Sequence, residues 1–314
     1  MSTRTRRPHL PRVISLAAGI AMLAISALLL SCSTLADIGT AVGVQQGTIS
    51  ESQAASIKQT ASAVEKSFQD ITPEQEYYLG RAVGAVILSQ YKTYDNQKAN
   101  DYVNYLGQSL ALVSDRPILY LGYRFQILNS DDLNALSTPS GLIFITRGLL
   151  RLATSEAEVA AILAHEIGHI EKKHALKAIK NSRITAALTS AALTGAQMAT
   201  NQDVAQLTEA FGGSVNDMTQ QLFNSGYSRT AETEADESGV TILERAGYDP
   251  RALVNILQAM RARSKPSSGV DFTRTHPLPA DRITDVQKTI GNYKAPGYDT
   301  AVTKQRFEQA LSGI

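Results

Sequence analysis

The feature that most constrains this chain is the pentapeptide His165-Glu166-Ile167-Gly168-His169, which lies in an apolar helical pattern starting at Ser155. Two histidines four residues apart project from the same face of an α-helix, so both imidazoles can bind one metal ion. Glu166 lies about 100° around the helix from His165, beside such a metal rather than on it. From there it can take a proton from an attacking water molecule as a general base. The pentapeptide therefore predicts a helix that carries a hydrolytic metal site.

A catalytic zinc ion needs a third protein ligand and an open coordination position. A third histidine six residues after His169 would be residue 175, but Ala175 stands there. A carboxylate early in the following helix is also excluded, since no acid occurs between Glu171 and Asp203. The third ligand must therefore come from a more distant segment.

The next acidic segment with a helical pattern, 228–236, contains Glu232, Glu234 and Asp236. Glu232 and Asp236 are four residues apart and share one helical face. One carboxylate there can bind the metal while another accepts a hydrogen bond from a ligand histidine and fixes its tautomer. The residues alone leave Glu232 and Glu234 equally suited to be the third ligand.

Hydrophobic periodicity and capping residues predict a mainly helical chain with one small sheet, which is the α+β class. Helices are expected from Thr72, across Val103–Val113, from Ser155, and over 229–246, 250–264 and 279–290, with a further helical pattern at 57–68. Strands are expected over 120–128 and 141–146, and the Ala-, Thr- and Ser-rich stretch 183–215 is expected to be a helix or a loop. The sheet should lie beside the helix that starts at Ser155.

The first 32 residues have the pattern of an export signal. Arg4 to Arg12 form a basic region, an uncharged apolar stretch covers 13–30, and Cys32 follows Leu29-Leu30-Ser31. This order resembles a bacterial lipoprotein signal, in which the cysteine carries the lipid. We therefore expect cleavage before Cys32, lipid attachment at Cys32 and, because Ser33 follows, a location at the periplasmic face of the outer membrane. An uncleaved membrane anchor is the alternative, since about 18 apolar residues can just span a bilayer.

Charge and cysteine content exclude two other classes. The chain has 30 Lys+Arg and 29 Asp+Glu, a formal net charge of +1, so it lacks the basic footprint of a nucleic-acid-binding protein. Its single cysteine excludes a disulfide framework and a four-cysteine metal site. We expect no nucleic-acid partner and a metal site built from histidine and carboxylate ligands.

Taken together, these motifs resemble the zinc metallopeptidases of peptidase family M48, the family of HtpX, LoiP and BepA. The resemblance rests on His165-Glu166-x-x-His169, on Ser228-Arg229-x-x-Glu232-x-x-Ala235-Asp236, and on Thr275-His276-Pro277 with Arg282. Residues 134–150 also resemble the strand and turn ahead of the family's zinc helix, so the resemblance covers about residues 72–290. The single-domain architecture is most similar to a lipoprotein of the LoiP kind.

The resemblance implies a zincin-type fold and one zinc ion per chain, held by His165, His169 and Glu232. Glu166 would be the catalytic base, and Asp236 would support a ligand histidine. The implied function is that of a zinc metalloendopeptidase in periplasmic quality control, acting on unfolded or misassembled envelope proteins. The alternative is a chaperone-like or binding module whose metal site is inhibited.

These inferences divide the chain into four expected segments. They are a lipoprotein signal peptide at 1–31, a spacer and helix at 32–71, the metallopeptidase domain at 72–291 and a C-terminal tail at 292–314. The boundaries follow the signal pattern and the extent of the resemblance.

Two further histidines lie near these motifs in the sequence. His174 is five residues after His169, so on a continuous helix it should point away from the metal and be structural or exposed. His276 precedes Pro277 and is expected in an extended or turn conformation from which it can reach the metal. In the resemblance it acts as a displaceable fourth ligand or stabilises the oxyanion, and the alternative is a cap for the helix at 279–290.

The strand expected over 141–146 runs into the turn before the zinc helix. An exposed edge strand can bind an extended peptide through its backbone, which suits a protease that accepts many sequences. We therefore expect substrate to lie antiparallel along an edge near residues 136–146. A wholly internal strand is the alternative, because Leu142 to Ile145 are all apolar.

Overall fold

The computed structural model describes residues 71–178, 226–263, 280–294 and 300–314, together with Thr275, His276 and scattered positions at 37–55 and 213–223. The apolar stretch 13–30, Cys32, the helical pattern at 57–68 and most of 183–215 lie outside the described residues. The chain divides into two compact units, Met1–Gln69 with Ile184–Asn201, and Asp70–Arg183 with Gln202–Ile314. The elements described below all belong to the second unit.

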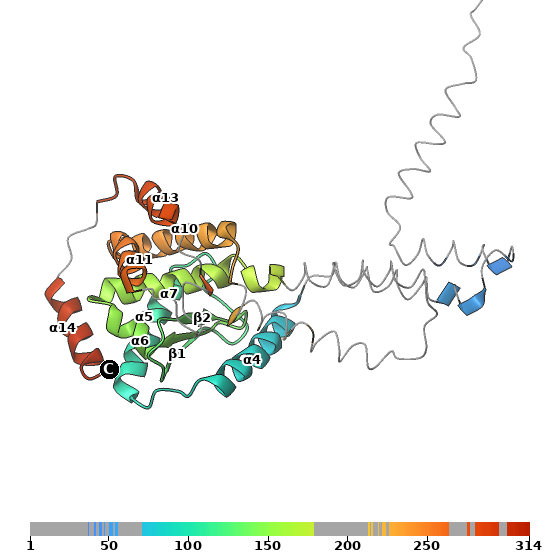
Figure 1. The fold of residues 1–314 in the computed structure, drawn as a ribbon, viewed down its shortest axis with the longest axis horizontal. Coiled ribbons are helices and arrows are strands. Elements are labelled where there is room, and N and C mark those ends of the chain that lie inside the picture. Colours follow the sequence, from blue (N-terminus) through green and yellow to red (C-terminus); the bar gives the residue numbers. More distant parts are fainter. Residues whose placement is uncertain are drawn as a thin grey trace, which may run out of the picture. The chain divides into compact units, whose positions relative to one another are not determined.

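The second unit is mainly helical, with one three-stranded sheet (Figure 1), so the expected α+β class is confirmed. Its elements are α4 (Pro73–Gln90), α5 (Gln97–Leu112), β1 (Arg124–Leu128), β2 (Ala135–Ser137), β3 (Leu142–Thr146), α6 (Arg147–Leu152), α7 (Glu156–Glu171), α10 (Arg229–Arg245), α11 (Arg251–Arg263), α13 (Ala280–Ile290) and α14 (Thr300–Leu311). All six helices expected within the described residues are present, as are both expected strands. None of the helices that the structure describes is long and apolar enough to cross a membrane.

The sheet has the strand order β1-β3-β2, with β1 parallel and β2 antiparallel to the central strand β3. Side chains alternate between the two faces of a strand. Phe144 therefore packs with Val83 and Ile87 of α4, whereas Ile143 and Ile145 belong to the larger core that includes the apolar side of α7. The sheet is thus buried on both faces, and β2 contacts α7, the helix predicted to start at Ser155.

Three elements were not predicted: β2, α6 and α14. Strand β2 is only three residues long, too short for a periodic pattern. Helix α6 begins directly at the end of β3, where the Thr146 side chain accepts a hydrogen bond from the amide of Leu149. Helix α14 lies within the expected tail, and its Arg306 pairs with the buried carboxylate of Glu156 at the start of α7.

Helices α7 and α10 approach each other closely at Gly168, between the two histidines of the motif. A Cβ atom at Gly168 would lie only 2.8 Å from the Ala235 carbonyl oxygen on α10. At Gly239, on α10, a Cβ would meet its nearest atom at 3.4 Å, which is an ordinary contact. The missing side chain of Gly168 is therefore what lets α10 come close to the motif.

Gly168→Ala is expected to destabilise the protein by about 1–3 kcal/mol, because the added methyl group overpacks the α7–α10 contact. Gly239→Ala is the matched control: it has room and gains up to about 1 kcal/mol of helix propensity. Urea unfolding of both variants measures the difference. Equal stabilities would contradict the close approach at Gly168.

Candidate metal centre

The pentapeptide lies in the second half of α7, and its neighbours account for this local structure. Ser155 caps the helix by accepting a hydrogen bond from the amide of Glu158. Apolar residues on the rest of the helix are completely buried, among them Val159, Leu163 and Ile167. The helix is therefore a rigid core element, and it holds His165 and His169 at fixed positions.

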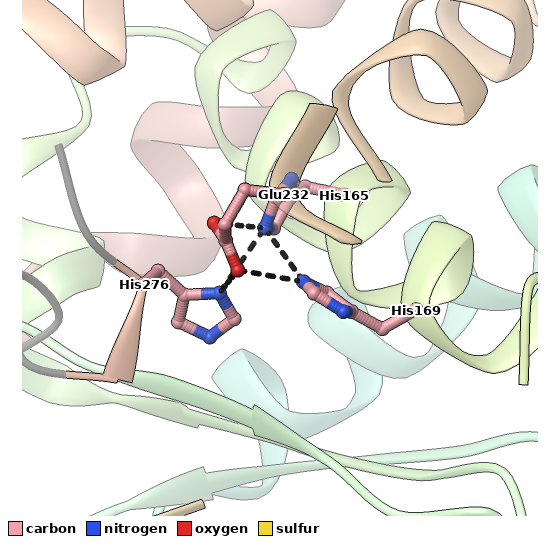
Figure 2. Close-up of side chains that lie close together, drawn as sticks. All are labelled: His165, His169, Glu232 and His276. Atoms are coloured by element: carbon pink, nitrogen blue, oxygen red, sulfur yellow. Dashed lines mark hydrogen bonds and ion pairs between the residues drawn. The ribbon is translucent and has the colours of Figure 1, made fainter. Parts of the chain in front are cut away.

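Four side chains converge at this point: His165 and His169 from α7, Glu232 from α10, and His276 (Figure 2). One ligand atom from each lies within 4.8 Å of the others, and all four residues are buried. His165 Nε2 lies 3.1 Å from His169 Nε2 and 3.3 Å from His276 Nδ1. Glu232 Oε1 lies 3.4 Å from His169 Nε2 and 3.0 Å from His276 Nδ1. The structure thus brings together the three expected ligands and the expected His276.

The geometry and chemistry of this cluster fit a metal ion. Zinc binds nitrogen and carboxylate oxygen at about 2.0–2.2 Å, so the ligand atoms of a tetrahedral site are about 3.3–3.6 Å apart. Five separations between nitrogen or oxygen atoms of these residues are 3.0 Å to 3.6 Å, and one ligand atom from each residue lies within 4.8 Å of the others. Glu166 is completely buried, and neither of its carboxylate oxygens accepts a hydrogen bond from a described residue. A cluster of buried acceptor atoms of this kind is what a cation would satisfy.

Arg282 of α13 sets the charge state of the acidic residues in the cluster. Its guanidinium lies 2.7 Å from Glu232 Oε2 and donates two hydrogen bonds to Asp236, of 2.7 and 2.8 Å. Burial alone would raise the pKa of Glu232, but His276 and Arg282 outweigh it and hold that pKa well below its ordinary value. Burial likewise opposes ionisation of Asp236, and Arg282 lowers its pKa overall. Both carboxylates are therefore charged, as a metal ligand and its supporting acceptor must be.

Asp236 lies on the far side of His165 from the ligand atoms. Its Oδ1 is 2.9 Å from His165 Nδ1, so it can accept a hydrogen bond from Nδ1–H, which directs the lone pair of the ring to Nε2, where a metal ion could bind. The structure thus places Asp236 at hydrogen-bond distance from His165 and outside the group of four clustered residues.

Burial acts in the same direction on the pKa of His169 and of His276, but the neighbouring charges make the outcomes differ. Desolvation lowers the pKa of His169 well below its ordinary value, which favours the neutral imidazole that binds metals. Desolvation acts the same way on His276, but Glu232 and Glu166 outweigh it and raise the pKa of His276.

His174 lies outside the group of four clustered residues, as expected, but the direction expected for its side chain is wrong. Its side chain is buried, and its Nδ1 lies 2.9 Å from His169 Nδ1 instead of pointing away from the metal face. Helix α7 ends at Glu171, and Lys173 adopts a left-handed conformation with φ of 56°. This change of direction returns His174 to the motif. The sequence gives little warning of it, because a lysine rather than glycine or asparagine occupies the left-handed position.

Tyr227 is a site residue that sequence analysis did not single out. Its ring stacks on the His169 imidazole, with 4.2 Å between ring centroids, and its amide donates to the Thr275 carbonyl oxygen. The Thr275 hydroxyl in turn donates to the Asn134 side chain, which fixes the segment that carries His276. The only sequence signal for Tyr227 is its place directly before the Ser228 cap of α10.

Comparison with known proteins identifies the family. The profile of peptidase family M48 matches residues 97–290, more than half of the chain. The chain is 29% identical over 194 residues to the beta-barrel assembly-enhancing protease of Yersinia pestis, covering 62% of this chain and 39% of that protein. It is 28% identical over 256 residues to a putative beta-barrel assembly-enhancing protease of Vibrio cholerae, covering 78% and 51%. It is 24% identical over 170 residues to the metalloprotease YcaL of Escherichia coli, covering 54% and 63%.

The chain thus spans about half the length, or less, of the first two of these relatives. The matched region contains the pentapeptide, the acidic segment of α10 and His276, and the histidine and glutamate cluster accords with the metal dependence of such peptidases. The family predicted from the sequence is confirmed: this chain belongs to peptidase family M48.

Proposed function

We propose that this protein is a zinc-dependent metalloendopeptidase. The observation that carries the proposal is the buried cluster of His165, His169 and Glu232 with Glu166 beside it, in a chain of a peptidase family. Two imidazole nitrogens and one carboxylate oxygen form a typical ligand set of catalytic zinc. The metal would polarise the scissile carbonyl and assist ionisation of water.

In the proposed mechanism, Glu166 accepts a proton from the attacking water and passes it to the nitrogen of the leaving amine. Its complete burial on a core helix favours this role, because a fixed carboxylate needs no reorganisation during the reaction. His276 Nδ1 lies in the same cluster and would be a further group able to hold the metal. Its imidazole N–H could donate a hydrogen bond to the oxyanion that forms on the substrate carbonyl.

We propose that substrate pairs with β2. Strand β3, which covers most of the strand expected at 141–146, is paired on both sides and is internal. At the two ends of β2, the Thr138 N–H donates a hydrogen bond to the Leu142 carbonyl oxygen, and the Thr146 N–H donates one to the Asn134 carbonyl oxygen. In an antiparallel pair, every second residue of a strand is bonded in this way to its neighbour. The N–H and C=O groups of Ser137 therefore point away from β3. An extended peptide on that side would add an antiparallel strand beside the metal cluster.

Ser137→Pro is expected to raise KM severalfold, because proline removes an N–H group that would pair with the substrate backbone. The far-ultraviolet circular dichroism spectrum must stay unchanged, since Ser137 N–H does not take part in the sheet. An unchanged KM in a folded Ser137→Pro variant would place the substrate elsewhere. The control is Ser137→Ala, which alters the side chain but keeps the N–H group.

We further propose that the chain acts at the periplasmic face of a bacterial outer membrane on unfolded or misassembled envelope proteins. Two similar proteins are named for enhancing β-barrel assembly, which supports envelope substrates. The lipoprotein-like signal ending at Cys32 supports the location.

Cys32→Ser is expected to abolish lipid attachment, because a hydroxyl group cannot replace the thiol that receives the lipid in a lipoprotein signal. Incorporation of labelled fatty acid in cells measures it. Label in Cys32→Ser at the wild-type level would show that Cys32 is not the lipid site, whereas absence of label from the wild type would favour the membrane-anchor alternative.

The test of the main proposal is hydrolysis of casein and of a quenched fluorescent peptide by the full chain, with and without a chelator. Hydrolysis that the chelator abolishes and added zinc restores is the expected result. Binding of unfolded casein without cleavage, in protein shown to be loaded with zinc, would instead favour the chaperone-like alternative.

A further inference from the structure

We propose that His174 and Glu234 form a hydrogen-bonded relay that positions His169 for metal binding. The inference rests on the proposed metal site and adds two positioning residues to it. Neither residue reaches the metal cluster itself. They act through the ring nitrogen of His169 that faces away from it.

The relay is a continuous chain of short contacts. His169 Nδ1 lies 2.9 Å from His174 Nδ1, and His174 Nε2 lies 2.9 Å from Glu234 Oε2. The His174 side chain is 3% exposed, whereas that of Glu234 is 39% exposed and also lies 3.6 Å from Lys177 Nζ. The relay thus runs from the buried metal cluster to the surface of α10.

The protons in this chain can be placed in one consistent way. For Nε2 of His169 to bind a metal, its proton must be on Nδ1, which then donates to Nδ1 of His174. His174 must therefore carry its own proton on Nε2, where it donates to the Glu234 carboxylate. Both imidazoles are neutral in this arrangement, and both ring nitrogens of His174 have a hydrogen-bond partner.

The relay holds the Nδ1 atom of His169 in place, as Asp236 holds the Nδ1 atom of His165. Each ligand histidine has its Nδ1 held from α10, directly by Asp236 in one case and through His174 to Glu234 in the other. Stacking of Tyr227 on His169 fixes the ring plane, and the relay fixes rotation of the ring within that plane. Two of the three acids of the α10 motif thus support ligands, and the third, Glu232, joins the cluster.

The experiment measures zinc affinity by competition with a chelator, in the full chain and without any activity assay. His174→Leu keeps a similar volume but leaves the His169 Nδ1–H group without an acceptor. We expect about a 10- to 100-fold loss of affinity, typical of residues that support a metal ligand. His174→Gln, which offers a carbonyl oxygen acceptor, is expected to retain more affinity than His174→Leu. Asp236→Asn serves as the comparison for the His165 side.

Glu234→Ala keeps the proposal testable if the buried variants fail to fold, because Glu234 is partly exposed. It should weaken zinc binding, whereas Glu237→Ala, which removes an exposed acid from the same helix, should not. The melting temperature of the metal-free protein separates positioning from packing. Equal zinc affinity in wild type, His174→Leu and Glu234→Ala would overturn the relay. The relay would also be overturned if the loss of zinc affinity followed the decrease in melting temperature of the metal-free variants and was equal in His174→Leu and His174→Gln.

The two proposals fail separately. Wild-type protein that binds zinc but cleaves no peptide would contradict the proposed function and leave the affinity results valid. Active wild-type protein with unchanged zinc affinity in the relay variants would contradict the relay alone.

Discussion

Glu166→Gln is expected to slow peptide hydrolysis by about 10²- to 10⁴-fold while zinc content stays at the wild-type level. Glutamine has the shape of glutamate but cannot accept the proton of the attacking water. Glu166 is not among the four clustered ligand atoms, so the metal site keeps its ligands. The substitution also removes a buried negative charge. This charge lies close to His276, whose Nε2 is 3.4 Å from Glu166 Oε1. The fold should tolerate this loss because Arg282 and His276 keep Glu232 as a partner.

The measurement compares kcat and zinc content of Glu166→Gln with those of Glu237→Gln, the same change at an exposed position of α10. The control should match wild type in both. Retained turnover in zinc-loaded Glu166→Gln would exclude Glu166 as the base. Loss of zinc together with activity would make Glu166 part of the metal site instead.

Glu232→Ala is expected to abolish both metal binding and hydrolysis. A structural zinc ion contributes about 10–16 kcal/mol over four ligands, so losing one ligand should weaken binding by more than about 10²-fold. The effect should be larger here, because Arg282 would keep its positive charge beside the site without the Glu232 carboxylate that lies 2.7 Å away. Zinc content after dialysis and chelator competition measure the loss.

The matched control is Glu234→Ala, an acid two residues away on the same helix, which the sequence alone did not distinguish from Glu232. It should keep zinc at saturating concentrations, because Glu234 contacts His174 and Lys177 rather than the cluster. Full zinc occupancy in Glu232→Ala would exclude Glu232 as a ligand. Loss of zinc from Glu234→Ala but not from Glu232→Ala would identify Glu234 as the ligand.

Local sequence patterns account for the elements and site residues that could be predicted. The spacing of His165 and His169, the cap at Ser155 and the apolar face of α7 all act within a few helical turns, so the sequence by itself determined helix α7 and the histidine pair on it. The same holds for α4, with its capping box at Thr72, and for α10, with its cap at Ser228. These features also predicted the α+β class and the family.

Contacts between distant segments decided the rest. Glu232 and Glu234 differ by two residues on one helix, and which of them joins the histidine cluster depends on how α10 packs against α7 at Gly168. The position of His174 depends on a single left-handed residue, Lys173, whose conformation no local propensity indicates. Pairing of β2 with β3 decided which strand lies at the edge, and Glu156 decided where α14 packs. The sequence by itself determined the helices and the residues that can carry the chemistry. Only the tertiary structure decided which of these residues contact one another, because each contact depends on packing between segments far apart in the chain.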